Sequence, residues 1–422
     1  MNLKNLSKNL VRFLKSSNQF LIVTSLFLSA SIFPAVQLIK PSENSYRDIQ
    51  EALILAEPGE IIRLSAGVFS LEDSLSLDVP GVQIEGEGMS QTILDFSNQL
   101  SGAQGLSVTS NNVTLQDFTI QNAKGDAIKV KGVTNIKFLR VKTEWTNGPS
   151  SDNGAYGLYP VESKNVLIDS CVAIGASDAG IYVGQSQNII VRNSRAEFNV
   201  AGIEIENSYF ADVYNNVATN NTGGILVFDL PGLPQQGGHH VRVFKNRSVG
   251  NNTDNFAPEG NIVGEVPRGT GIIIQANSDV EIFDNEIGDN DTVNIAVVTY
   301  GNDTDDHAYY PHPKSVQIHG NKFGPTGYNP DTSKGELAQI LFDLSGGNMP
   351  DIFWDGLLPL SQLIFGQPEN EKMIIANNGD ATMLAIKPFG YMLPFLEPAI
   401  LDITKFSGEI TPLEKVEFDE TF

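Results

Sequence analysis

The sequence predicts an all-β fold, a single-stranded right-handed parallel β-helix with coils of about 22 residues. A glycine-led phrase recurs as GLYP at 157–160, GIYV at 180–183, GIEI at 202–205, GILV at 224–227 and GIII at 271–274. The glycines of successive phrases lie 23, 22, 22 and 47 residues apart. Short apolar runs in each repeat are separated by Asn, Asp, Ser and Gly, which indicates strands joined by tight turns rather than helices. Such coils stack about 4.8 Å apart.

Composition limits the classes of partner. The chain has 422 residues, and its 27 Lys and Arg against 50 Asp and Glu give a formal net charge of −23. An acidic surface disfavours nucleic acid and anionic membranes, and it also disfavours polyanionic substrates unless a cation bridges them. Cys171 is the single cysteine, so an intrachain disulfide is excluded and a buried packing role is expected.

The first 36 residues differ from the rest of the chain. Four basic residues precede an apolar run, FLIVTSLFLSASIFPAV, and the segment contains no acid. This pattern predicts a secretory signal peptide, and an uncleaved anchor is the alternative. We therefore expect an exported protein, periplasmic or extracellular, with no membrane span after cleavage.

The remaining chain divides into a repeat region and a cap. We expect residues 37–330 to form the β-helix. The stretch 46–56 has apolar residues at helical spacing and is predicted to be a short helix that covers the open N-terminal end. The repeat pattern fades after about residue 330, so 331–422 is predicted to be an irregular C-terminal cap.

Two polar columns mark the turns between strands. The second strand of each coil follows a polar residue, and another polar or small residue follows that strand. Stacked Asn side chains hydrogen-bond turn backbones and one another, so we assign these columns a structural role. The columns contain Asn112, Asn135, Asn165, Asn188, Asp279 and Ser315, and then Cys171, Ser194, Asn216, Asn246, Asn285 and Asn321.

Four insertions interrupt the repeat and flank one strand column. Residues 144–156 and 253–270 precede a GIxV strand, whereas 229–240 and 300–313 follow one. Insertions in solenoids form loops, which often lie beside the binding face. The GIxV strands are therefore predicted to form the floor of a groove, and the insertions are predicted to form its walls.

Strand alternation then identifies the residues on the groove floor. The residue after each glycine points inward and the next points outward. The middle coils carry the catalytic candidates Lys129, Tyr159, Tyr182, Glu204 and Glu206. The first outward column contains Ser107, Lys129, Tyr159, Tyr182, Glu204, Leu226, Ile273 and Ala296, and the second contains Thr109, Lys131, Val161, Gly184, Glu206, Phe228, Gln275 and Val298.

These residue types suit a sugar chain. Aromatic rings stack on sugar faces, while exposed tyrosines also simply pack well on parallel sheets. Glu204 and Glu206 project about 7 Å apart along one strand, which suits an inverting glycosidase, although solvated carboxylates are normal in an acidic chain. For a uronate, Lys129 would hold the carboxylate, and Tyr159 or Tyr182 would act as acid or base, which for a base needs a strongly lowered pKa.

Further candidates lie in the second column and in the loops. Phe228, Gln275, Arg268 and His240 are predicted to contact substrate, with Arg268 suited to a substrate carboxylate and a surface arginine as its alternative. A divalent cation is conceivable near His239, His240, His307, His312 and the aspartates 303, 305 and 306, but these match no strict ligand signature, and solvated loop histidines are the alternative.

With these phrases identified, residues 61–330 resemble the pectin-lyase-type β-helix. They are similar to carbohydrate-binding and sugar-hydrolase β-helix repeats, to the copper-associated NosD proteins and, more distantly, to mannuronan C5-epimerases. The epimerase signature places Asp-Pro-His-Asp after an aromatic-Gly-apolar lead, and here Tyr156-Gly157-Leu158 is followed by Tyr159-Pro160-Val161-Glu162. The residues that the resemblance implies for epimerase catalysis are thus replaced. SDAGIYVGQS, VAGIEIENS and NTGGILVFDLPGLP resemble secreted tandem β-helix repeat proteins.

Three functions are consistent with the sequence. The first is binding, with lyase, epimerase or hydrolase processing, of a polysaccharide in the groove. The second is a non-catalytic module that binds a glycan or a protein of the cell envelope, which the apolar end at Leu226, Phe228 and Ile273 favours. The third, which follows from the NosD resemblance, is a metal-associated periplasmic role.

Overall fold

The computed structural model describes residues 35–333, 339, 342–389 and 396–420, so nearly all of the predicted signal segment lies outside the described residues. Residues Val36–Phe422 form one compact unit. No helix among the described residues is long and apolar enough to cross a membrane.

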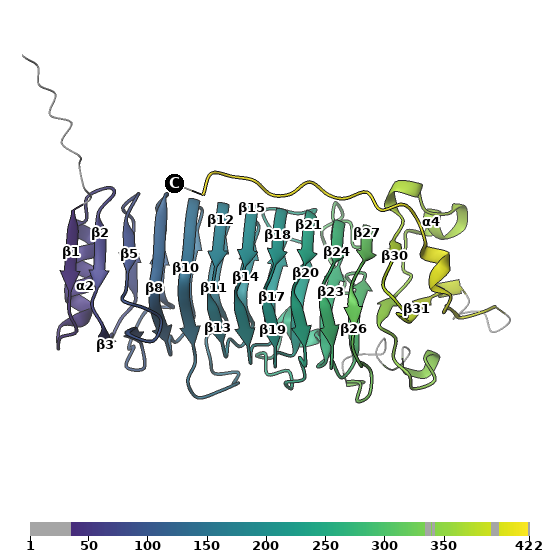
Figure 1. Cartoon of the computed structure of the whole chain (residues 1–422), viewed down its shortest axis with the longest axis horizontal. Coiled ribbons are helices and arrows are strands. Elements are labelled where there is room, and N and C mark those ends of the chain that lie inside the picture. The colour runs from purple at the N-terminus through teal and green to yellow at the C-terminus, as the bar shows by residue number, and fades with distance from the viewer. Residues whose placement is uncertain (1–34, 334–338, 340–341, 390–395, 421–422) are drawn as a thin grey trace, which may run out of the picture. The chain divides into compact units, whose positions relative to one another are not determined.

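The unit is a right-handed parallel β-helix, and the predicted fold class is confirmed (Figure 1). The GIxV strands build a 12-stranded sheet, here called the GIxV sheet, in which only the last pair is antiparallel. Its order is β4 (Leu75–Leu77), β7 (Gln104–Val108), β9 (Asp126–Lys131), β11 (Tyr156–Val161), β14 (Ala179–Gly184), β17 (Ala201–Glu206), β20 (Gly223–Phe228), β23 (Thr270–Gln275), β26 (Val293–Val298), β29 (Ile352–Trp354), β31 (Met383–Ile386) and β32 (Ala399–Ile400).

The other two strands of each coil form a 20-stranded sheet, here called the second sheet. One ladder contains β1 (Val36–Ile39), β2 (Ile61–Leu64), β5 (Gln83–Glu85), β8 (Val113–Gln121), β10 (Thr134–Glu144), β12 (Lys164–Asp169), β15 (Gln187–Arg192), β18 (Tyr209–Tyr214), β21 (His239–Phe244), β24 (Ser278–Phe283), β27 (Lys314–His319) and β30 (Ile374–Ala376). The other contains β3 (Gly67–Ser70), β6 (Thr92–Asp95), β13 (Val172–Ile174), β16 (Arg195–Glu197), β19 (Val217–Thr219), β22 (Arg247–Val249), β25 (Glu286–Gly288) and β28 (Lys322–Phe323), and it joins the first through β8 and β10.

The interior of the coils is a continuous apolar core. The inward residue after each phrase glycine is fully buried, as in the paired column Ile181, Ile203, Ile225, Ile272 and Ile295. Complete burial of such a side chain contributes roughly 1.5–3 kcal/mol. Helix α2 (Ser45–Leu55) places Ile49, Ala52 and Leu53 in this core, as the predicted N-terminal helix requires.

The polar columns are structural, as predicted. Asn246 donates to Asn285 at 3.1 Å, and Asn285 donates to Asn321 at 2.9 Å, in a buried ladder that continues to Asn378. The other column begins at Asn112 with φ 59°, a left-handed conformation that Asn tolerates better than most residues. Cys171 is buried and free, in agreement with its expected packing role.

The C-terminal region continues the stack beyond the predicted boundary at residue 330. Strands β29 and β31 extend the GIxV sheet, and β30 extends the second sheet. Helix α4 (Leu360–Phe365) and the 3-10 turns η3 (Glu369–Glu371) and η4 (Ile403–Phe406) lie between and after these strands.

Residues 407–420 then run back along the stack as an extended strap (Figure 1, yellow). Hydrogen bonds tie the strap to successive coils of the second sheet. Thr411 exchanges two bonds with Gln317, and the Leu413 amide donates to Glu281. At its end, Glu420 accepts two bonds from Arg192. The strap therefore covers charged and polar side chains that would otherwise face solvent.

Candidate active site on the GIxV sheet

The strand register confirms the predicted outward columns but not their exposure. Lys129 pairs with Tyr159, Tyr182 pairs with Glu204, and Glu204 pairs with Leu226. The expected open groove is wrong over most of the column, because Tyr182 is 4%, Glu204 3% and Leu226 0% exposed. Glu206, Phe228, Ile273 and Ala296 are buried as well.

The insertions cover most of the sheet face. Val263 and Val266, from the 253–270 loop, join the outward residues Leu226, Phe228 and Ile273 in a second apolar cluster outside the coils. Burial of an apolar column against loop side chains removes a patch that would promote association if it stayed exposed. The apolar end of the predicted floor is thus largely covered by loop side chains.

The loop after β20 is fixed by hydrogen bonds to the preceding coil. The Asn207 side chain donates to the Leu230 carbonyl at 2.8 Å and accepts from the Leu230 amide at 2.8 Å. Gln235 donates to the Asn207 carbonyl at 2.7 Å. These bonds hold Leu230 against the sheet face, where it is buried.

Tyr156, Tyr159 and Tyr182 pack together on the part of the GIxV sheet that the loops leave half exposed. The ring centroids of Tyr156 and Tyr159 are 4.4 Å apart, and Tyr182 lies 4.7 Å from Tyr156 and 5.0 Å from Tyr159. The Lys129 ammonium lies 4.8 Å above the Tyr159 ring and 3.7 Å from Asp126. Tyr156, Tyr159 and Lys129 are half-buried, so this end remains accessible.

Carboxyl groups lie at the deep end of the tyrosines. Tyr182 donates to Glu206 at 2.7 Å, and Tyr156 donates to Asp178 at 3.3 Å. Glu204 is paired in register with Tyr182, and its Oε2 is buried without a hydrogen-bond partner among the described residues. Together, the tyrosine–carboxylate cluster comprises Asp126, Lys129, Tyr156, Tyr159, Asp178, Tyr182, Glu204 and Glu206.

Burial raises the pKa values of these acids. It raises the pKa of Asp126 to about 6 and the pKa of Glu206 to about 7. Burial, followed by the Glu206 charge, raises the pKa of Asp178 to about 7, and burial holds the pKa of Glu204 well above its usual value. Buried neighbouring carboxyls avoid simultaneous ionisation, so the cluster carries protons near neutral pH.

The same burial argues against a tyrosine base. It raises the pKa of Tyr159 to about 12, and it raises the pKa of Tyr182 well above the usual value. A base would require the opposite shift. Tyr159 and Tyr182 can donate hydrogen bonds or protons, and their raised pKa values disfavour the predicted role of either as a base.

Gly184 gives Tyr182 its orientation. A Cβ atom at position 184 would lie 2.3 Å from the Tyr182 hydroxyl oxygen and 2.4 Å from its ring. The ring therefore lies across Gly184 and reaches Glu206 in the next coil. Position 184 requires glycine because the Tyr182 ring approaches it closely, and not because of the backbone angles of residue 184.

Sequence reasoning missed four members or neighbours of the cluster. Asp126 and Asp178 stand at or just before a GIxV strand, where the repeat alone could have suggested them. Tyr156 was assigned to an insertion, although it begins β11. Asn261 donates to Asp178 at 3.3 Å from the 253–270 loop, and no local pattern indicates that contact across the chain.

Two predicted substrate contacts lie elsewhere. Arg268 is paired with Asp254 at 2.9 Å and with Asp291 at 3.5 Å, so it links its own loop to the turn before β26. His240 lies in β21 of the second sheet, with its Nδ1 2.8 Å from that of His239 and 3.7 Å from Asp279. The expectation that these residues line the groove on the GIxV sheet is wrong.

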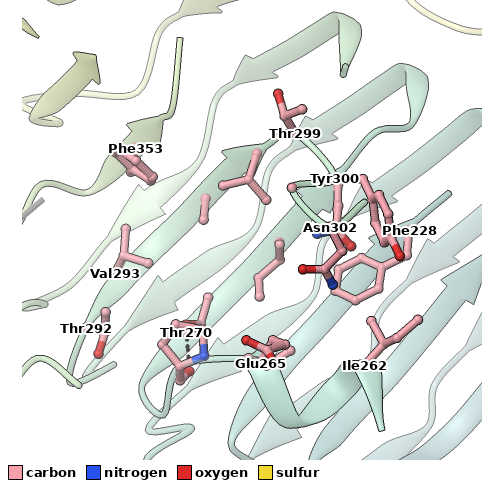
Figure 2. A pocket seen from close by; sticks show the side chains of 17 residues that line it. Phe228, Ile262, Glu265, Thr270, Thr292, Val293, Thr299, Tyr300, Asn302 and Phe353 are labelled. Atoms are coloured by element: carbon pink, nitrogen blue, oxygen red, sulfur yellow. Dashed lines mark hydrogen bonds between the residues drawn. The ribbon is translucent and has the colours of Figure 1, made fainter. Parts of the chain in front are cut away.

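Phe228 and Gln275, by contrast, line an apolar pocket of about 240 Å³ on the GIxV sheet (Figure 2). The floor comes from outward residues of β20, β23 and β26, and Phe353 closes one end. Loop residues Ile262 and Glu265 lie on one side, and Tyr300 and Asn302 lie near Phe228. Two insertions thus form a cavity between them.

The histidines do not assemble a metal site. Among the described residues, no group of three or more His, Cys, Asp or Glu side chains is arranged to hold a metal ion. His312 contacts Thr299 and His319 contacts Glu281, so these two histidines make separate local contacts.

The coils, parallel ladders and stacked turns define a right-handed parallel β-helix protein. The family described as a right-handed beta helix region matches residues 80–232. No curated protein matches the sequence. Among solved structures, the N-terminal fragment of gene product 12 of bacteriophage Phi29 is similar, with TM-score 0.50 and 12% identity over 81% of this chain and 60% of that chain.

Two further similar structures carry enzyme names. The A-module of mannuronan C-5 epimerase AlgE4 from Azotobacter vinelandii has TM-score 0.45 and 15% identity over 79% of this chain and 89% of that chain. Alginate lyase from a Paenibacillus species has TM-score 0.41 and 12% identity over 83% of this chain and 97% of that chain. At these identities the similarity concerns the fold alone.

Proposed function

We propose that this chain is an exported protein that binds a neutral polysaccharide across the tyrosine–carboxylate cluster. The observation that carries the proposal is the half-buried pair Tyr156 and Tyr159, whose rings lie 4.4 Å apart beside Lys129 and Asp126. Aromatic rings offer an apolar face to sugar C–H groups, and the flanking polar groups bind hydroxyls. Export is supported by the basic and apolar pattern of residues 1–36.

The charges favour a neutral chain over a polyuronate. Lys129 is paired with Asp126, and Lys131 is paired with Glu162 at 3.3 Å. Arg268, the predicted partner of a substrate carboxylate, is already paired with two aspartates. A polyanion would also meet a chain of net charge −23, which repels it.

Binding measurements on a glycan panel test this function. Titration calorimetry should detect one or more neutral glucans, xylans, mannans or galactans, and Tyr159→Ala should weaken that binding about tenfold, as expected for an aromatic contact. The matched control is Tyr328→Ala, because Tyr328 is an exposed tyrosine outside the cluster. Equal losses in both variants, or selective binding of polygalacturonate or alginate, would contradict the proposal.

A second candidate function is glycoside hydrolysis at the same cluster. It is favoured by Asp178 and Glu206, whose raised pKa values of about 7 allow one carboxyl to hold a proton while another accepts one. One acid would protonate the leaving oxygen and a carboxylate would activate water. The Asn261 contact with Asp178 would have to open before a sugar reached these groups.

Reducing-end assays separate binding from hydrolysis. If the cluster is catalytic, the wild-type protein releases new reducing ends from a bound neutral glycan, and Glu206→Gln abolishes release while retaining binding. If no bound glycan is cleaved, the hydrolase reading fails and binding alone remains. Unsaturated ends would instead indicate the lyase chemistry that the paired Lys129 disfavours.

A further inference from the structure

The apolar pocket on the GIxV sheet begins one coil beyond the tyrosine–carboxylate cluster. Phe228 is paired in register with Glu206 on one side and with Gln275 on the other. Asn261 contacts the cluster through Asp178, whereas the next residue, Ile262, lines the pocket. The loop at 261–262 therefore separates the two sites.

The pocket is built for an apolar body. Its floor and end walls come from Phe228, Ile273, Val293, Ala296 and Phe353, and these side chains are buried. The loop residues Val266 and Tyr300 add apolar surface from above. The volume of about 240 Å³ is close to that of eight water molecules and just below the roughly 300–1,000 Å³ that drug-sized ligands occupy. A compact ligand of two fused rings, or a branched acyl group of similar size, suits this space.

One polar group in the lining lacks a partner. The side-chain oxygen Oε1 of Gln275 is buried and accepts no hydrogen bond from the described residues. A buried acceptor without a donor is unfavourable, and native structures usually satisfy such groups. Gln275 is the paired neighbour of Phe228 and Val298, both of which also line the pocket. Because this oxygen is buried, the Gln275 amide must rotate toward the pocket, and a hydroxyl or N–H group on a bound molecule would then satisfy it.

We infer that this pocket binds a small, mostly apolar molecule with one hydrogen-bond donor directed at Gln275. The apolar body packs against the outward residues of β20, β23 and β26, and the donor bonds to Gln275 Oε1. This pocket is distinct from the tyrosine–carboxylate cluster, because neither Tyr156 nor Tyr159 lines it. Its occupation does not depend on whether the cluster binds sugar.

An isosteric probe pair tests the inference on the whole protein. 2-Naphthol carries a donor where 2-methylnaphthalene carries a methyl group, so the two differ in the donor but hardly in shape. Calorimetry or ligand-detected NMR should show both compounds bound, with 2-naphthol about tenfold tighter in the wild-type protein. In Gln275→Leu this ratio should fall to about one, while 2-methylnaphthalene stays bound.

Controls distinguish the pocket from non-specific binding. Ala296→Leu fills the floor and should weaken both probes at least tenfold, whereas Tyr328→Ala, outside the pocket, should change neither. Circular dichroism verifies that each variant folds. If Ala296→Leu does not fold, the affinity ratio of the two probes in Gln275→Leu still tests the inference. The inference is overturned if neither probe binds, or if both bind wild type equally. It also fails if 2-methoxynaphthalene, which lacks a donor, binds as tightly as 2-naphthol.

Discussion

The buried acids make the stability of this protein fall as pH rises, and Glu206→Gln should remove part of that fall. Burial raises the pKa of Glu206 from 4.5 to about 7 in the folded chain. Between these values the unfolded chain has lost the proton that the folded chain still holds, so folding takes up a proton. The contribution of Glu206 to stability is therefore full below pH 4.5 and declines until about pH 7.

The magnitude follows from the shift. Each pKa unit corresponds to about 1.4 kcal/mol, so a rise of 2.5 units predicts a decline of roughly 3 kcal/mol in the free energy of unfolding. This is an upper figure, because Asp178 shares its protons with Glu206. A neutral Gln keeps the acceptor for the Tyr182 hydroxyl and does not titrate.

Urea unfolding followed by circular dichroism from pH 4.5 to 8 measures the effect. Glu206→Gln should match wild type near pH 4.5 and exceed it by up to about 3 kcal/mol at pH 7.5. Glu286→Gln, which changes an exposed acid paired with Arg247, is the control and should follow the wild-type curve. Parallel curves for wild type and Glu206→Gln would refute the argument that Glu206 is buried with a raised pKa.

Three further changes test the surrounding structure. Arg192→Met removes the two bonds that hold Glu420, so limited proteolysis should release the C-terminal strap severalfold faster than in wild type; an unchanged rate would show that the strap is held elsewhere. Asn246→Ala leaves buried backbone groups of adjacent coils unsatisfied and should lower the free energy of unfolding by about 3 kcal/mol in urea. Gly184→Ala forces the Tyr182 ring aside and should cost about 2 kcal/mol, measured in the same way; a neutral result would contradict the close approach.

The repeat was sufficient to predict the stacked coils up to about residue 330. Alignment of the recurring phrase places Lys129 beside Tyr159 and Tyr182 beside Glu204, and both register pairs are present. It also assigned the Asn246 column to the turns, because the same backbone need recurs in every coil. Local rules succeed where each coil repeats the same hydrogen bonds.

Burial of the site could not be predicted, because it depends on loops outside the repeat. Asn261 reaches Asp178, and Val266 covers the column that contains Leu226, although nothing periodic relates these positions. The raised pKa values of Glu204 and Glu206 result from burial by these loops. Because the loops are not part of the repeat, the strand sequence alone does not distinguish a solvated carboxylate pair from a buried one. Loop trajectories depend on distant contacts, and the same limit caused the errors on Arg268 and His240.

Hydroxyl-radical footprinting with a bound neutral polysaccharide tests the central claim most directly. If the glycan lies on the tyrosine–carboxylate cluster, oxidation of Tyr156 and Tyr159 falls on binding, while that of Tyr328 and of Phe210 on the second sheet is unchanged. Undiminished oxidation of Tyr156 and Tyr159, with protection of Phe210, would place the ligand on the opposite sheet and contradict the account.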